Sequence, residues 1–176
     1  ISDADLWEQR FAALAANDVI TSLDPNARPV VVKDKEPYVA RLLRIMKHAR
    51  VLKLSDEDLE YLAPDQQLMD AFEHICSETQ AAIIILTKGA DGAVVRCGST
   101  QFDVAAAQAN PLVDTVGAGD TFMGTLLVEI SKTGLSASKL GSIAKDDLTR
   151  IVTRAAKAAA LNCQSAGCNP PYEQDL

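Results

Sequence analysis

Two glycines and a carboxylate lie close together in the segment Val113–Phe122, at the start of a predicted helix. Gly117 and Gly119 lack a Cβ atom, so the backbone there can turn sharply and approach a ligand closely. The first amides of a helix have no acceptor within the helix and lie at the positive end of its dipole, which suits a bound phosphate. Asp120 beside such an anion is repulsive unless it has a task, and accepting a proton from a hydroxyl that attacks phosphorus fits. The segment therefore predicts a phosphoryl-transfer site with Asp120 as its general base.

Two better-known glycine motifs do not match this loop. A P-loop requires G-x-x-x-x-G-K-[ST], and no lysine lies in the loop. A dinucleotide fingerprint, G-x-G-x-x-G, requires a third glycine where Phe122 stands. A turn that only caps a helix accounts for the glycines, but it does not account for the polar residues around them, which are Asp114, Thr115, Asp120 and Thr121.

The scaffold that must hold these residues is predicted to alternate between helices and strands. Expected strands are Val19–Leu23, Val51–Leu54, Ala82–Leu86, Ala93–Arg96 and Phe102–Ala105, the last two antiparallel. Expected helices are Asp3–Ala16, Pro37–Lys47, Asp56–Leu62, Asp65–Ser77, Ala118–Lys132 and Asp146–Cys163, with a loop at Gly134–Lys145. We also expect Ser55 to cap its helix together with Asp58, and Trp7 to pack from its helix. This alternation indicates an α/β fold with a mostly parallel sheet.

Polar residues follow the predicted strands at their ends. In α/β folds, ligands bind outside the carboxyl ends of the strands. Asp24, Ser55, Thr87 and Asp114 each come closely after an apolar strand. We therefore expect these four residues to converge at one edge of the sheet.

The composition limits the classes of function. The chain has 176 residues, 48% of them hydrophobic, which suits one domain with a sizeable core. Its net charge is −7 and it has no basic run, so neither nucleic acid nor a membrane surface is an expected partner. The four cysteines form no C-x-x-C pair, and we expect buried, reduced thiols in a cytoplasmic protein. No apolar run reaches the ~18 residues of a membrane span.

The segment Asp114–Phe122 (D-T-V-G-A-G-D-T-F) resembles the C-terminal signature of the PfkB, or ribokinase-like, carbohydrate kinases. Four further segments resemble motifs of this family in the same order, closest to its fructokinase and 2-keto-3-deoxygluconate kinase branch. They are Ser22–Pro29 (D-x-N-x-R), Lys53–Leu62 (K-x-S-x-x-E-x-x-x-L), Thr87–Ala93 (T-x-G-x-x-G) and Ala159–Gly167, which resembles the helix and turn that close the nucleotide pocket. The resemblance implies a ribokinase-like three-layer α/β/α fold.

The resemblance also implies an activity: transfer of the γ-phosphate of ATP, with Mg²⁺, to a primary hydroxyl of a small sugar such as fructose or a related keto sugar. It implies Asp120 as the base, with Gly117, Ala118 and Gly119 in the catalytic loop. The nucleotide residues that it implies are Thr87, Gly89, Gly92, Gly117, Gly119 and Asn162, and the substrate residues are Asp120, Arg28 and Asn26.

Two metal sites are implied as well. A monovalent cation such as K⁺ would be held by Asp114, Val116, Ser165 and Gly167. Asp58 would organise the water shell of Mg²⁺, although the ribokinase pattern has Asn and Glu where this chain has Ser55 and Asp58, and the fructokinase branch tolerates only the Ser. A plain helix cap accounts for Asp58 about equally well.

Members of the family are substantially longer than this chain, and the residues with which their N-terminal half grips the sugar are not visible here. We therefore expect residues 1–176 to be the C-terminal, nucleotide-binding portion of a single ribokinase-like domain, without its N-terminal part and β-lid. The expected partners are a small sugar and ATP, and a second copy in a full-length homodimer. The alternatives are a nucleotide-binding fragment without catalysis of its own and, less favoured for want of the third glycine, a dinucleotide oxidoreductase.

Overall fold

The computed structural model describes residues 2–176, which form two compact units. The first unit contains residues 2–87, 95–99 and 136–142, and the second contains residues 88–94, 100–135 and 143–176. Within the described residues, every helix is too short or too polar to span a bilayer. That the whole chain belongs to a single domain stays a prediction.

Three parallel strands form the centre of the first unit. They are β1 (Ser22–Leu23), β2 (Val51–Ser55) and β3 (Ile83–Thr87). Residues 51–54 and 83–86 are all buried, as expected for parallel strands that are covered on both faces. The strand order of the sheet is β1-β2-β3-β4-β5, where β4 (Ala93–Cys97) and β5 (Thr100–Val104) are joined by a tight turn. The sheet is therefore mostly parallel, with a final hairpin, as predicted.

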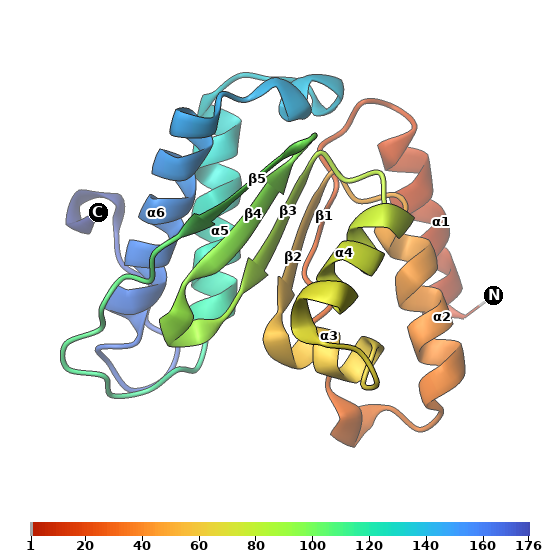
Figure 1. Cartoon of the computed structure of the whole chain (residues 1–176), viewed down its shortest axis with the longest axis horizontal. Coiled ribbons are helices and arrows are strands. Elements are labelled where there is room, and N and C mark those ends of the chain that lie inside the picture. The colour runs from red at the N-terminus through yellow and green to blue at the C-terminus, as the bar shows by residue number, and fades with distance from the viewer. Residues whose placement is uncertain (1) are drawn as a thin grey trace. The chain divides into compact units, whose positions relative to one another are not determined.

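Four helices lie beside the strands of the first unit: α1 (Asp3–Ala15), α2 (Lys35–Met46), α3 (Asp56–Leu62) and α4 (Leu68–Glu78) (Figure 1). Their apolar faces and the strands share one core. Its fully buried side chains include Met46, Leu52, Leu54, Leu59, Phe72, Ile83 and Ile85. Burial of such side chains contributes roughly 1.5–3 kcal/mol each, so the core is the main source of stability for this unit.

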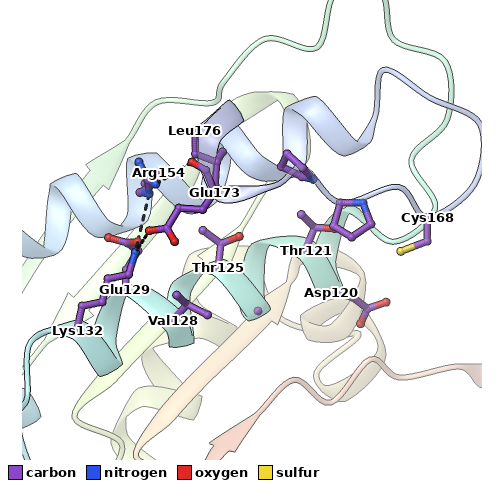
Figure 2. Close-up of a pocket in the computed structure, with 13 residues that line it drawn as sticks. Asp120, Thr121, Thr125, Val128, Glu129, Lys132, Arg154, Cys168, Glu173 and Leu176 are labelled. Atoms are coloured by element: carbon purple, nitrogen blue, oxygen red, sulfur yellow. Dashed lines mark hydrogen bonds and ion pairs between the residues drawn. The ribbon is translucent and has the colours of Figure 1, made fainter.

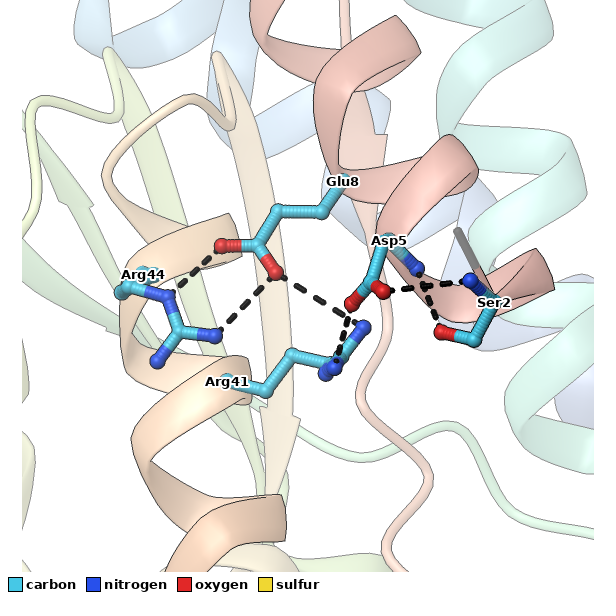
Figure 3. Close-up of polar contacts among 5 residues, drawn as sticks. All are labelled: Ser2, Asp5, Glu8, Arg41 and Arg44. Carbon is cyan, nitrogen blue, oxygen red and sulfur yellow. Dashed lines mark hydrogen bonds and ion pairs between the residues drawn. The ribbon is translucent and has the colours of Figure 1, made fainter.

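Charged side chains join α1 to α2 at the surface (Figure 3). Arg41 Nη2 lies 2.7 Å from Asp5 Oδ1, and Arg44 Nε lies 2.7 Å from Glu8 Oε1. Hydrogen bonds lower the pKa of Asp5, the largest effect coming from Ser2 and the next from Arg41. The Arg44 guanidinium lowers the pKa of Glu8. These pairs are open to solvent, so they fix the helix contact without adding much stability.

Two long helices dominate the second unit. In Figure 1, α5 (Ala118–Lys132) and α6 (Lys145–Asn162) run side by side. Ala155 and Ala158 are fully buried, and such small side chains let the two helix backbones come close. The remaining buried side chains of the two helices include Leu126, Ile130, Leu148, Ile151 and Val152. This packing sets the direction of α5, and therefore the direction in which its N-terminal amides point.

Most predicted elements are present with ends shifted by a few residues, and four expectations were wrong. The strand expected at Val19–Leu23 is only Ser22–Leu23, and the expected loop at 134–145 contains a short 3-10 helix, Ala137–Ser142. Trp7 is 74% exposed and therefore does not pack into the core of its unit. Cys168 is exposed, whereas the other three cysteines are buried and all four are unpaired.

Candidate active site

The N-terminus of α5 has the features of an anion site. Gly117 precedes the helix with a φ of +77°, and its carbonyl accepts from the Thr121 amide at 2.9 Å. Among residues 2–176, the amides of Gly117, Gly119 and Asp120 have no hydrogen-bond acceptor. The Asp120 side chain is exposed in the first turn. Free amides and a carboxylate therefore lie next to each other, as the sequence predicted.

Gly117 is required at this position for two reasons. Its positive φ is a conformation that residues with a side chain rarely adopt. In addition, a Cβ atom on Gly117 would lie only 2.4 Å from Cys168 Sγ. Cys168 therefore closes one side of the loop, a role that nothing in its sequence context indicated.

Asp114 ties the loop before α5 to the turn that follows α6. Its carboxylate accepts hydrogen bonds from the amides of Gly167 at 2.8 Å and Val116 at 3.1 Å. These two bonds lower the pKa of Asp114, and the bond from Gly167 has the larger effect. The amides of Val113 and Asp114 both donate to the Cys163 carbonyl, at 2.8 and 3.2 Å. The loop is thus held by a charged side chain and by backbone bonds.

Asn162 adds a second tie between the same two segments. Its side chain is completely buried at the end of α6. Nδ2 donates to the Val116 carbonyl and Oδ1 accepts from the Asn169 amide, both at 2.8 Å. Asn169 Nδ2 in turn donates to Ser165 Oγ at 3.2 Å. The structure therefore gathers five predicted site residues here: Asp114, Val116, Asn162, Ser165 and Gly167.

A groove of about 490 Å³ runs along α5 (Figure 2). Asp120 and Cys168 lie at one end of it. At the other end, Glu129 Oε1 lies 2.8 Å from Lys132 Nζ and 3.2 Å from Arg154 Nε. The Asp120 side chain is thus exposed at one end of this groove.

The first unit contains a second polar loop, residues 24–28, directly after β1. Lys53 is 4% exposed and its Nζ lies 2.8 Å from Asp24 Oδ2. The Ala27 amide donates to Asp58 Oδ1 at 2.8 Å. Asn26, which has a φ of +47°, is exposed between the fixed residues Asp24 and Ala27. Arg28 is exposed directly after Ala27. The loop is therefore held at two points and presents Asn26 and Arg28, two of the three predicted substrate residues, to solvent.

Asp58 uses both carboxylate oxygens within the protein. Besides Ala27, it accepts from the Ser55 amide at 2.9 Å and from the Ser55 hydroxyl at 2.7 Å, and it is 2% exposed. The capping box predicted at the start of α3 is confirmed. These contacts favour a helix cap as the role of Asp58 over a place in the water shell of Mg²⁺. Within the described part of the chain, no three His, Cys, Asp or Glu side chains gather as metal ligands would.

The segment Thr87–Gly92 forms a turn after β3. Thr87 Oγ1 donates to the Leu54 carbonyl at 3.2 Å in the first unit. In the second unit, Gly92 has a φ of +84°, and a Cβ there would lie 2.3 Å from the Val104 carbonyl oxygen. Gly89 has a φ of +53° and open space around it. Close backbone packing accounts for Gly92, and the nucleotide contacts of this turn stay a prediction.

The predicted edge of polar residues is confirmed for the three strands of the first unit. Ser55 and Thr87 are direct partners across β2 and β3, and Asp24 follows the end of β1. Their convergence with Asp114 stays a prediction. Lys53 contacts Asp24, a role that the sequence motifs do not assign to it. A lysine within the apolar run V-L-K-L nevertheless indicated a buried charge that needs a partner.

The chain matches known proteins over nearly its whole length. Residues 2–175 match the model of the pfkB family carbohydrate kinases. A fructokinase from Rhizobium leguminosarum bv. trifolii is 38% identical over 131 residues, which cover 74% of this chain and 39% of the relative.

Solved structures of fructokinases have a similar fold. A fructokinase with bound ATP from Xylella fastidiosa superimposes with a TM-score of 0.81 at 23% identity, over 94% of this chain and 52% of that one. A fructokinase double mutant from Vibrio cholerae O395, in a form bound to fructose, ADP and potassium ion, gives a TM-score of 0.75 at 27% identity, over 90% and 49% of the two chains. The present chain therefore spans about half, or less, of the length of these proteins.

Proposed function

Because this chain belongs to the pfkB family of carbohydrate kinases, as its motifs and its ribokinase-like fold predicted, we propose that the protein containing it phosphorylates a small sugar. The phosphate donor is ATP, and the acceptor is a primary hydroxyl of fructose or a related keto sugar. The observation that carries this proposal is the N-terminus of α5, where free amides of Gly117 and Gly119 adjoin the exposed carboxylate of Asp120. Similarity to fructokinases supports the choice of sugar.

Asp120 acts as the general base in this proposal. It accepts the proton of the sugar hydroxyl as that oxygen attacks phosphorus. The loop from Gly117 to Asp120 presents amides to the negative charge that develops on the transferred group. ATP would supply the phosphoryl group and leave as ADP when the bond between its γ-phosphorus and the β-phosphate oxygen breaks, and Mg²⁺ bound with it would neutralise part of the negative charge. The residues of the chain thus orient the hydroxyl, take its proton and stabilise the phosphate oxygens.

A monovalent cation fits beside the loop. Hard cations prefer oxygen ligands, and the Asp114 carboxylate lies next to the turn that contains Ser165 and Gly167. The Val116 carbonyl accepts one hydrogen bond, from Asn162, which leaves its second lone pair for a cation. We propose K⁺ at this position, and the potassium-bound form of the Vibrio cholerae relative supports the choice of ion.

The remaining predicted residues complete the proposal. Thr87, Gly89 and Gly92 would contact the nucleotide, in keeping with their turn after β3. Asn26 and Arg28 would contact the substrate or the transferred phosphoryl group, because both are exposed on a pinned loop and a guanidinium matches phosphate geometry.

Asp120→Asn is the test of this function, because it keeps the shape of the side chain and removes the base. We expect kcat to fall by about 10²–10⁴-fold, with ATP binding nearly unchanged, in the full-length protein that the gene encodes. Asp146→Asn is the matched control, since Asp146 is an exposed acid in the first turn of α6 and should leave kcat unchanged. Wild-type turnover in the Asp120 variant would contradict the proposal.

A second candidate function is nucleotide binding without catalysis. The free amides at the start of α5 favour it, because they suit a bound phosphate whether or not a sugar hydroxyl is phosphorylated. The intact mass of the purified protein separates the two. A mass near 18.8 kDa with ATP binding but no sugar turnover favours the binding module, and a clearly larger mass with turnover favours the kinase.

A further inference from the structure

Asn162 is a buried polar side chain that the phosphoryl-transfer chemistry does not use directly. It is completely buried, and both ends of its amide bond to backbone groups at 2.8 Å, Nδ2 to the Val116 carbonyl and Oδ1 to the Asn169 amide. Because the amide is completely buried, a nucleotide base would not reach it without displacing one of these bonds. We propose that Asn162 is a positioning residue, which sets the anion loop by fixing the peptide between Val116 and Gly117. This inference rests on the proposed kinase function of the loop.

The bond to Val116 determines where the next amide points. In a trans peptide, the carbonyl oxygen and the following N–H point to opposite sides of the chain. Because the Val116 carbonyl points at Asn162, the N–H of Gly117 points away from it. In the described chain that N–H has no acceptor, and it is the first of the free amides at the anion site. One side-chain bond therefore orients the first donor for the phosphate.

The second bond of Asn162 holds the opposite wall of the same loop. Asn169 follows Cys168, whose sulfur occupies the space next to Gly117. By holding the Asn169 amide, Asn162 fixes both segments at once. A carboxamide offers a donor and an acceptor at this spacing without bringing a charge near bound phosphate. A carboxylate would keep the acceptor and lose the donor.

Asp114 provides an independent tie between the same segments through Gly167. Loss of Asn162 should therefore loosen the loop without separating the two segments. We expect the effect on catalysis to exceed the effect on folding, which distinguishes a positioning residue from a structural one.

Two variants of the full-length protein test the proposal. Asn162→Asp keeps the acceptor for Asn169 and removes the donor to Val116, while Asn162→Ala removes both. We expect kcat to fall by about 10–100-fold in both variants, with the KM for the sugar within about twofold, because a misdirected loop amide weakens stabilisation of the transition state. Gln101→Ala is the control, since Gln101 is an exposed carboxamide residue on β5 that takes no part in these bonds and should leave kcat unchanged.

Amide hydrogen exchange gives a readout that does not depend on activity. The bonded amides of Val116 and Ala118 should exchange faster in both Asn162 variants, while those in the middle of α5 should keep wild-type rates. If the wild-type protein phosphorylates no sugar, the proposed function fails, and the exchange data still test Asn162. Wild-type exchange at Val116 and Ala118 in folded variants would overturn the inference. So would an Asn162→Ala protein that is unfolded at about 10 °C, where folded domains are near their greatest stability, because Asn162 would then be a residue of the fold.

Discussion

The two polar loops of this molecule are held in different ways. The loop 24–28 of the first unit is fixed by buried charges, Lys53 on Asp24 and Asp58 on the Ala27 amide. The loop 113–120 of the second unit is fixed by a neutral carboxamide, by backbone bonds to Cys163 and by the more open carboxylate of Asp114. The first loop presents the side chains of Asn26 and Arg28, and the second presents backbone amides.

This difference follows from what each loop offers to a ligand. A side chain can reach a ligand through its own rotatable bonds once its backbone is held in place. Two contacts that involve charged groups are therefore enough to position the loop 24–28. An amide points where the backbone points, so the loop 113–120 needs a defined φ at Gly117 and a defined peptide plane at Val116. The first loop should therefore be sensitive to loss of charge, and the second to change of backbone shape.

Among the substitutions that test the difference between the two loops, Gly117→Ala should have the largest effect, and it should act on kcat/KM. The methyl group collides with Cys168 Sγ, and a positive φ costs a residue with a side chain about 1–2 kcal/mol. We expect kcat/KM of the full-length protein to fall at least about 10²-fold, because the loop amides move. Gly124→Ala is the control: it lies in α5 with open space around it and should stabilise the protein by about 0.5–1 kcal/mol. Unchanged kinetics for the Gly117 variant would show that loop shape is not limiting.

Lys53→Met should have the next largest effect, and mainly on stability. It leaves the Asp24 carboxylate without its partner, and breaking a buried pair in this way lowers the free energy of unfolding by roughly 3 kcal/mol. Adding Asp24→Asn should restore most of that loss, which urea unfolding of the four proteins of a double-mutant cycle measures. Additive losses in the double variant would mean that the pair does not hold the loop 24–28.

Acid should affect the loop 113–120 through Asp114. Its pKa is lowered in the folded protein, so the stability that it contributes is complete above its unfolded value and is lost as the pH falls through the folded value. Between about pH 5 and pH 3, we therefore expect the wild-type protein to lose more stability than an Asp114→Asn variant, in unfolding curves at each pH. Parallel pH profiles for the two proteins would contradict the assignment of Asp114 as a charged tie.

The smallest effect is expected at the α1–α2 ion pairs, which hold no site. Glu8→Gln removes the pairs with Arg44 and Arg41, and because these groups keep contact with solvent we expect Tm to change by less than about 3 °C. That change should vanish in about 1 M salt, which screens exposed charges. Glu60→Gln on α3 is the control, as an exposed glutamate outside this network. A larger, salt-independent change would mean that buried packing between the helices was disturbed.

Features that depend on neighbouring residues could be predicted from the sequence. The ends of α5, the capping box of Ser55 and Asp58, and the glycine turn before Asp120 are all set by contacts within about one helical turn. The order of the motifs likewise identified the family, and the apolar runs identified the buried strands β2 and β3.

Only the tertiary structure decided which residues hold the loops. Asn162 meets Val116 across 46 positions, and Lys53 meets Asp24 across 29. No local sequence pattern indicates that Cys168 lies against Gly117 or that Trp7 is exposed. Such contacts depend on how α6, β2 and α1 pack within their own units. The sequence by itself therefore determined the chemical groups and the local turns, and packing determined which buried side chains aim them.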